Sequence, residues 1–156
     1  MSSNELMVLE ERLQKIDVTR LVEFTRKIKD IGGLNHMLAP QYLRDFILAY
    51  DHTNSMLSLA VRYDSEAGSH LDTAKSIAFL DRAGDYLKER DIKDSAESRK
   101  RYIDMDVDVK RAANIKAKTT ALVVFLKNKL QAFRMSHDDV KKMVYTDSYQ
   151  TPEEGF

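Results

Sequence analysis

The stretch that decides the fold is residues 115–134, which read IKAKTTALVVFLKNKLQAFR. When each residue is turned by 100° about a helix axis, five apolar side chains fall within a sector of about 80°. These five are Ile115, Leu122, Leu126, Leu130 and Phe133. Basic side chains border this stripe, with Arg111, Lys118 and Lys129 on one edge and Lys116, Lys127 and Arg134 on the other. We therefore expect a long helix from about Val107 to Met135.

A narrow apolar seam with charged borders is typical of coiled-coil and subunit-interface helices. This pattern predicts that the same five apolar residues form an interface between copies of the chain. The borders also fit a second interpretation, in which basic side chains cover the edges of an intramolecular core with their stems while their charged ends stay in water. The sequence alone leaves both open.

The remainder of the chain also has helical periodicity. Only 5 glycines and 2 prolines occur among 156 residues, and the apolar positions recur at intervals of three and four. We expect a first helix over residues 4–29, with a kink near Asp17 to Thr19. The paired Gly32 and Gly33 should end it, because glycine adopts the left-handed conformation of a helix C-cap.

Three more helical segments are expected. Pro40 suits the first turn of a helix over residues 40–67, which Gly68 should stop. A third helix is expected over residues 72–93, and Ser136 should cap a short helix after the long one. The fold class is therefore all-α, with a single helical domain over residues 1–145 and a flexible acidic tail over residues 146–156.

The formal net charge is zero, but its distribution along the chain is uneven. Residues 99–142 carry 12 basic and 5 acidic side chains, whereas residues 51–98 carry 6 basic and 10 acidic ones. This segregation suggests an anionic partner for one face, neutralisation by another subunit, or ordinary solvated helix faces. The chain has no cysteine and no apolar run long enough for a membrane span, so we expect a cytoplasmic location without membrane contact.

Catalytic and metal-binding patterns are weak. The four histidines (His36, His52, His70 and His137) are scattered and form no metal-binding pair. The acids Asp104, Asp106 and Asp108 resemble the start of a calcium loop, but Val109 and Ile115 replace the glycine and the chelating glutamate that such a loop needs. We expect no enzymatic activity, no cofactor and no metal, and interpret the acids as favourable charges at the N-terminus of the long helix.

Two short stretches combine cations with aromatic rings. They are Arg62-Tyr63 and the run Arg99-Lys100-Arg101 followed by Tyr102. Proteins that bind single-stranded DNA use such pairs to hold phosphates and stack bases, so we take Arg62, Tyr63, Arg99, Lys100 and Arg101 as the candidate DNA-binding residues. The alternative is that the tyrosines are amphipathic packing residues at helix ends.

Two parts of the chain resemble the UvsY recombination mediators of T-even-type bacteriophages. Residues 59–64 read LAVRYD and are followed by Gly68, which is similar to a family segment Leu-x-x-Arg-x-Asp-x-x-x-Gly associated with single-stranded DNA binding. The second part extends from Lys100 to Met143. Ala60 stands where the family pattern has a lysine, and the chain carries an insertion over residues 69–98 and a longer N-terminus.

The resemblance implies a small helical protein that forms a ring and binds single-stranded DNA through a residue matching Arg62. It implies that the protein helps to load a recombinase onto DNA covered by single-strand-binding protein, without enzymatic activity of its own. The partners expected on this basis are single-stranded DNA, the recombinase, the single-strand-binding protein and further copies of the chain. The alternative is a structural or assembly subunit of a phage particle, such as a neck or virion component.

Overall fold

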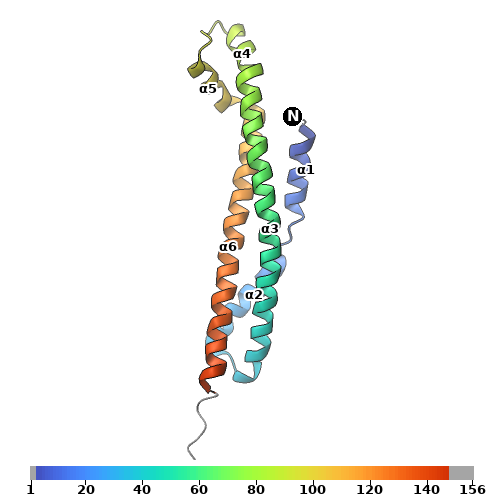
Figure 1. Cartoon of the computed structure of the whole chain (residues 1–156), viewed down its shortest axis with the longest axis vertical. Helices are drawn as coiled ribbons and strands as arrows, with labels where there is room; N and C mark the ends of the chain where they lie inside the picture. Colours follow the sequence, from blue (N-terminus) through green and yellow to red (C-terminus); the bar gives the residue numbers. More distant parts are fainter. Residues whose placement is uncertain (1–2, 148–156) are drawn as a thin grey trace, which may run out of the picture. The chain divides into compact units, whose positions relative to one another are not determined.

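The computed structural model describes residues 3–147, and within this part of the chain the secondary structure is helical, without strands (Figure 1). The predicted all-α class and the long C-terminal helix are confirmed. None of the helices in residues 3–147 combines the length and the apolar character that crossing a bilayer requires.

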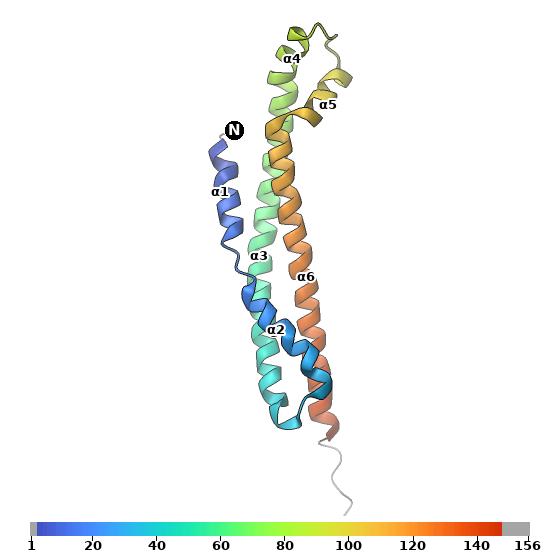
Figure 2. The ribbon, with the colours of Figure 1, turned by 180° about the vertical axis from the view of Figure 1, so that it is seen from behind.

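Within residues 3–147 six α-helices follow one another, with short 3₁₀ and π segments between some of them. Their bounds are α1 (Ser3–Gln14), α2 (Thr19–Asp30), η1 (Ile31–Gly33), η2 (His36–Leu38), α3 (Ala39–Ile77), the π segment η3 (Ala78–Arg82), α4 (Ala83–Glu89), α5 (Ala96–Met105) and α6 (Val107–Asp147). Figure 2 shows the same ribbon from behind, where α2 and α5 are easier to follow.

The chain divides into two compact units, and α3 and α6 each contribute to both. Unit 1 contains the residues up to Ile16 together with Leu59–Val123. Unit 2 contains Asp17–Ser58 and the residues from Val124 onward. Whether residues 1–145 behave as one domain stays a prediction.

A seven-residue repeat of buried positions follows both long helices. In α3 the fully buried side chains along this repeat are Ala39, Phe46, Thr53, Ala60 and Ala67, and Ala74 is nearly so. In α6 they are Ala112, Thr119, Leu126, Phe133 and Val140. A repeat of seven is the spacing that keeps one stripe of a helix against its neighbour, as in coiled coils.

The core of unit 1 is built from α1, α3 and α6. The core members on α3 are small, and the larger ones come from α1 and α6. The larger side chains of α1 and α6 therefore fill the space beside the small residues of α3. The buried members are Leu6, Leu9, Ala67, Ala74, Ala78, Val109, Ala112 and Ile115.

The core of unit 2 uses aromatic side chains. Phe133 of α6 is fully buried and meets Phe24 of α2 edge to face, with ring centroids 6.1 Å apart. Phe46 of α3 is also fully buried and contacts Tyr42 in the same edge-on arrangement. Such pairs contribute about 0.5–1.5 kcal/mol beyond the area they bury.

Two expected helix boundaries are wrong. Gly68 lies inside α3, and Ser136 is buried inside α6. Neither interrupts its helix, because the buried seven-residue repeat continues past both positions and packing outweighs the local preference. Gly32 and Gly33 follow the end of α2, but they form a 3₁₀ turn, and no glycine in residues 3–147 has a positive φ.

The expected kink in the first helix is a full break between α1 and α2. The side chain of Asp17 accepts a hydrogen bond from the backbone N–H of Thr19 at 2.8 Å and so starts α2. Burial would raise the pKa of Asp17, but the hydrogen bonds from Thr19 are the largest effect and lower it below its ordinary value.

The segment between α4 and α6 contains a helix, α5, that the sequence did not predict. Asp91 adopts a left-handed conformation (φ 53°) after α4, and Ser95 then caps α5 by accepting a hydrogen bond from the N–H of Ser98 at 3.1 Å. The first two residues of the expected tail, 146 and 147, belong to α6, and its part from residue 148 onward lies outside the described residues.

Candidate nucleic-acid interface

The segment that resembles the mediator family lies on α3 in unit 1. Arg62 is exposed, and no hydrogen bond or ion pair holds its side chain to the described part of the chain. Tyr63 is half-buried against the unit 1 core, so its ring is only partly available for stacking. Ala60 is fully buried, which means that this position makes no contact with a ligand in this fold.

Asp64, two residues after Arg62, binds across to α6. Its Oδ2 lies 2.7 Å from Nζ of Lys116, and its Oδ1 accepts hydrogen bonds from the hydroxyls of Thr119 (2.8 Å) and Thr120 (2.7 Å). Desolvation would raise the pKa of Asp64, but the hydrogen bonds from Lys116, Thr120 and Thr119 outweigh it and lower the pKa. The carboxylate is therefore held ionised as a structural link between the two helices.

Gly68 lies one turn further along α3 and faces the same lysine. A Cβ placed there would lie 3.8 Å from Cε of Lys116, which is ordinary van der Waals distance. A Cβ would therefore fit at Gly68, and the packing against Lys116 does not require a glycine at this position. Of the polar residues in this segment, Asp64 has a structural partner, whereas Arg62 has none among residues 3–147.

The basic run on α5 is only partly available to a ligand. Arg99 is held by Asp94 through two hydrogen bonds of 2.7 Å, and it donates a third to the carbonyl oxygen of Phe79 at 2.8 Å. The hydrogen bonds to Asp94 are the main reason that the pKa of Arg99 is raised and that of Asp94 lowered. Arg99 is therefore a structural clamp between α5 and the π segment η3.

The two residues that follow Arg99 in the basic run are more accessible to a ligand. Lys100 is exposed and has no partner among residues 3–147. Arg101 is exposed and pairs with Glu97 one turn earlier, at 2.7 Å. Exposed pairs of this kind contribute little and open readily, so both cations can reach an external anion.

Arg62 and the α5 cluster do not form one patch. Seventeen residues separate Arg62 from Phe79, where Arg99 is anchored, and this corresponds to about 25 Å along the helix at 1.5 Å per residue. A ligand that touched both would have to be extended.

The acids before α6 have a structural role. Oδ1 of Asp106 accepts from the N–H groups of Asp108 (3.0 Å) and Val109 (3.1 Å), which makes Asp106 the N-cap of α6. Arg82 of η3 binds both Asp106 and Asp108. The expectation that these acids favour the helix N-terminus is confirmed for Asp106 and Asp108, and the expected lack of metal binding stays a prediction.

The predicted interface residues are largely covered within one chain. Ile115 is fully buried in unit 1, and Leu126 and Phe133 are fully buried in unit 2. Leu122 and Leu130 are half-buried. The seam therefore packs against the chain's own helices, and its role in joining copies stays a prediction.

Most of the basic borders also have partners in the same chain. Glu10 of α1 binds Arg111 (3.4 Å) and lies 3.7 Å from Lys118. Lys116 binds Asp64, and Lys129 donates to Thr25 of α2 at 3.1 Å. These contacts favour the interpretation in which the cations line an intramolecular core.

A hollow of about 310 Å³ lies between α2 and α6 in unit 2. Its described lining consists of apolar residues, basic residues and one threonine, without an acid: Val18, Leu21, Val22, Thr25, Arg26, Lys29, Phe125 and Lys129. The sequence did not bring these residues together, although Val22, Arg26 and Lys29 have the four- and three-residue spacing of a single helix face. We call this site the α2–α6 pocket.

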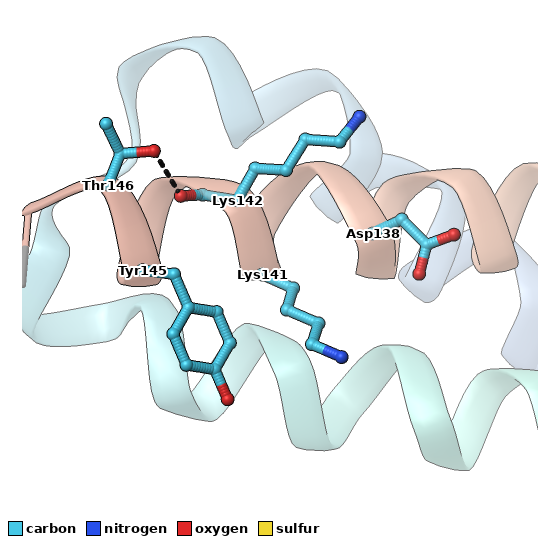
Figure 3. A pocket seen from close by; sticks show the side chains of 5 residues that line it. All are labelled: Asp138, Lys141, Lys142, Tyr145 and Thr146. Atoms are coloured by element: carbon cyan, nitrogen blue, oxygen red, sulfur yellow. Dashed lines mark hydrogen bonds between the residues drawn. The ribbon is translucent and has the colours of Figure 1, made fainter.

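A second hollow lies beside the end of α6. The described residues that line it are Asp138, Lys141, Lys142, Tyr145 and Thr146. In Figure 3, Lys141 and Tyr145 lie on the same side of the helix, and Nζ of Lys141 is 5.9 Å from the ring centroid. All of these residues lie on one face of α6, close to the end of the described residues. We therefore propose no ligand for this hollow.

No protein-family model, curated protein sequence or solved structure matches this chain. The resemblance to recombination mediators rests on the residues quoted for it.

Proposed function

We propose that this chain is a non-enzymatic protein that binds single-stranded DNA and acts as a recombination mediator. In this role it helps a recombinase to load onto DNA covered by single-strand-binding protein, and it works in the cytoplasm where these partners are found. The observation that carries the proposal is the state of Arg62, an exposed arginine in the family-like segment that no structural contact explains.

An arginine without a structural partner is suited to phosphate. Its guanidinium stays charged at any physiological pH and presents several N–H donors in a plane that matches phosphate oxygens. The neighbouring Asp64 is bound to Lys116, which leaves Arg62 as the charged side chain of the segment without a partner in residues 3–147. Lys100 and Arg101 add two exposed cations on α5.

A chain with a net charge of zero is expected to bind DNA weakly as a single copy. Repeating Arg62 and the α5 cations around an oligomer lets one strand contact many subunits, and the linked contacts multiply through effective concentration. The proposed mediator is therefore a homo-oligomer, in keeping with the ring that the resemblance implies.

The test is a fluorescence-anisotropy titration of labelled single-stranded and duplex oligonucleotides of equal length, at low and at higher salt. We expect binding to single strands that is preferred over duplex and weakens steeply with salt, because each phosphate contact releases counterions. Lack of binding to either nucleic acid at low salt would contradict the proposal. It would favour the alternative role as a structural or assembly subunit of a phage particle.

A further inference from the structure

The α2–α6 pocket combines exposed apolar side chains with basic side chains. Phe125 is 40% exposed, and the neighbouring Val22 is 50% exposed, so the pocket has an apolar side open to solvent. Arg26, Lys29 and Lys129 contribute three cations to the same lining. An apolar hollow with cations at its edge fits a ligand in which an anionic group is attached to an apolar ring.

Contacts between α2 and α6 hold the two helices together at the pocket. Leu21 is 1% exposed, and Phe24, three residues on, packs against Phe133, so α2 is anchored through this face. Thr25 donates to the carbonyl oxygen of Leu21 at 2.6 Å and accepts from Nζ of Lys129 at 3.1 Å. Helix α2 and the Lys129 side chain are therefore fixed at the pocket before any ligand arrives.

Phe125 and Lys129 form a cation–ring pair within the pocket. Nζ of Lys129 lies 5.6 Å from the ring centroid of Phe125, because the two residues are one turn apart on α6. Arg26 and Lys29 are exposed and have no hydrogen bond or ion pair with residues 3–147. Two cations thus remain available for an anion beside a ring that is partly exposed.

We propose that the α2–α6 pocket binds a nucleotide of single-stranded DNA, with the base against Phe125 and the phosphates on Arg26 and Lys29. The volume of about 310 Å³ is at the lower end of small-ligand pockets, which suits one nucleotide unit. A base stacks on an aromatic ring whatever its identity, so the site would be tolerant of sequence. This inference rests on the proposed function and adds a contact site that the family-like segment does not contain.

The other ligand that this chemistry could suit is an acidic amphipathic peptide. A helix bound in a groove needs several apolar anchor sites in a row, at the spacing of successive helical turns. The described lining forms a single hollow around Phe125, which favours one flat ring over a row of anchors.

The chain contains no tryptophan, so a single indole can report on the pocket. We would prepare Phe125→Trp and, as a matched control, Met135→Trp on the same helix, where the methionine is 58% exposed. Both variants are titrated with unlabelled oligothymidylate while the indole fluorescence is recorded. The anisotropy of a labelled oligothymidylate is measured in parallel. We expect quenching of the indole in Phe125→Trp that saturates together with the anisotropy, and little change in Met135→Trp.

Loss-of-function variants complete the test. Phe125→Leu keeps an apolar side chain but removes the ring, and Arg26→Gln combined with Lys29→Gln removes two cations. We expect each to weaken binding on the order of tenfold, the size of one stacked base. The double variant Lys75→Gln with Lys88→Gln removes the same charge from exposed positions on α3 and α4 and should bind as the unmodified chain does.

The outcomes separate this inference from the proposed function. If the unmodified chain binds single strands but the pocket variants bind equally well and the indole is not quenched, the pocket is not a DNA site and the proposed function stands. If the unmodified chain does not bind at low salt, the proposed function fails as well. Quenching by an acidic peptide but not by oligothymidylate would also overturn the inference.

Discussion

Nζ of Lys116 lies 2.7 Å from Oδ2 of Asp64 and donates to the carbonyl oxygen of the same residue at 3.1 Å, which ties α6 to α3 in unit 1. Removing this carboxylate takes the ion-pair partner from Lys116, which keeps the carbonyl oxygen of Asp64, and takes an acceptor from the hydroxyls of Thr119 and Thr120. We predict that Asp64→Ala lowers the free energy of unfolding by about 2–3 kcal/mol, and Asp64→Asn by about 1 kcal/mol. Urea denaturation measures both, and Asp72→Asn, an exposed position on the same helix, should stay within about 0.5 kcal/mol of the unmodified chain.

The same carboxylate predicts a dependence of stability on pH. Since the pKa of Asp64 in the folded chain lies below its ordinary value of 3.8, the contribution is complete above that value and is lost as the pH falls through the folded pKa. The difference in unfolding free energy between the unmodified chain and Asp64→Asn should therefore be constant near neutral pH and shrink as the pH falls below the ordinary value of 3.8. A difference that is unchanged in acid would show that the carboxylate contributes no charge-dependent stability.

Arg99 is predicted to act on structure and not on DNA. Arg99→Lys keeps the positive charge but cannot reproduce the two parallel hydrogen bonds to Asp94 together with the bond to Phe79. We expect faster amide hydrogen exchange in α5 with little change in affinity for single-stranded DNA. Lys100→Gln should do the reverse, with unchanged exchange and weaker binding, because Lys100 has no partner in the described chain. Equal amide hydrogen exchange of α5 in Arg99→Lys and Lys100→Gln would contradict the structural role of Arg99.

The helices could be predicted from local periodicity, but several of their ends could not. Gly68 and Ser136 carry local signals for a helix stop and a helix start, and a glycine in a helix interior costs about 1 kcal/mol relative to alanine. The structure continues through both, since Ala67 and Ala74 on α3, and Phe133 and Val140 on α6, are buried on either side. This burial depends on residues distant in sequence, which a local pattern does not report.

The candidate site was only partly predictable for the same reason. Arg62 could be selected because a short motif contains it. Arg26 and Phe125 lie almost a hundred residues apart, so that nothing local brings them to one pocket. Arg99 shows the opposite failure, because a basic run indicates positive charge but not the intramolecular acceptors, Asp94 and Phe79, that already bind it.

The seam of α6 yields a prediction about stability. Leu126 and Phe133 are fully buried, so Leu126→Ala should cost about 2–5 kcal/mol and Phe133→Ala about 3–5 kcal/mol. Val124→Ala, at a position 52% exposed, is the control and should cost less than about 1 kcal/mol. Thermal and urea unfolding measure these differences. Similar losses in all three variants would contradict the buried seam.

The predicted association of copies needs a separate measurement. Light scattering of the unmodified chain should give a mass several times 18.0 kDa at micromolar concentration. A mass of one chain under these conditions would exclude a stable oligomer and leave the seam as an intramolecular core only.

Arg62 gives the sharpest prediction about function, because it can be compared with Asp64 on the next half-turn of α3. Arg62 is exposed and unpaired within residues 3–147, so Arg62→Gln should change the free energy of unfolding by less than about 0.5 kcal/mol. Its affinity for single-stranded DNA should fall for every sequence tested, since a phosphate contact positions a strand without reading its bases. The slope of log affinity against log salt should become shallower by about 0.7 for each phosphate contact that is lost.

Asp64→Asn should show the opposite behaviour, with lower stability and an unchanged salt slope at temperatures where the variant is folded. If Arg62 repeats around an oligomer, Arg62→Gln removes one contact from every subunit that the strand touches, so the change in slope should grow with oligonucleotide length until the strand has reached all subunits. Slopes measured with short and long oligothymidylates therefore report how many copies of Arg62 one strand contacts. An unchanged slope at every length, with the oligomer intact, would place the DNA-binding surface away from Arg62.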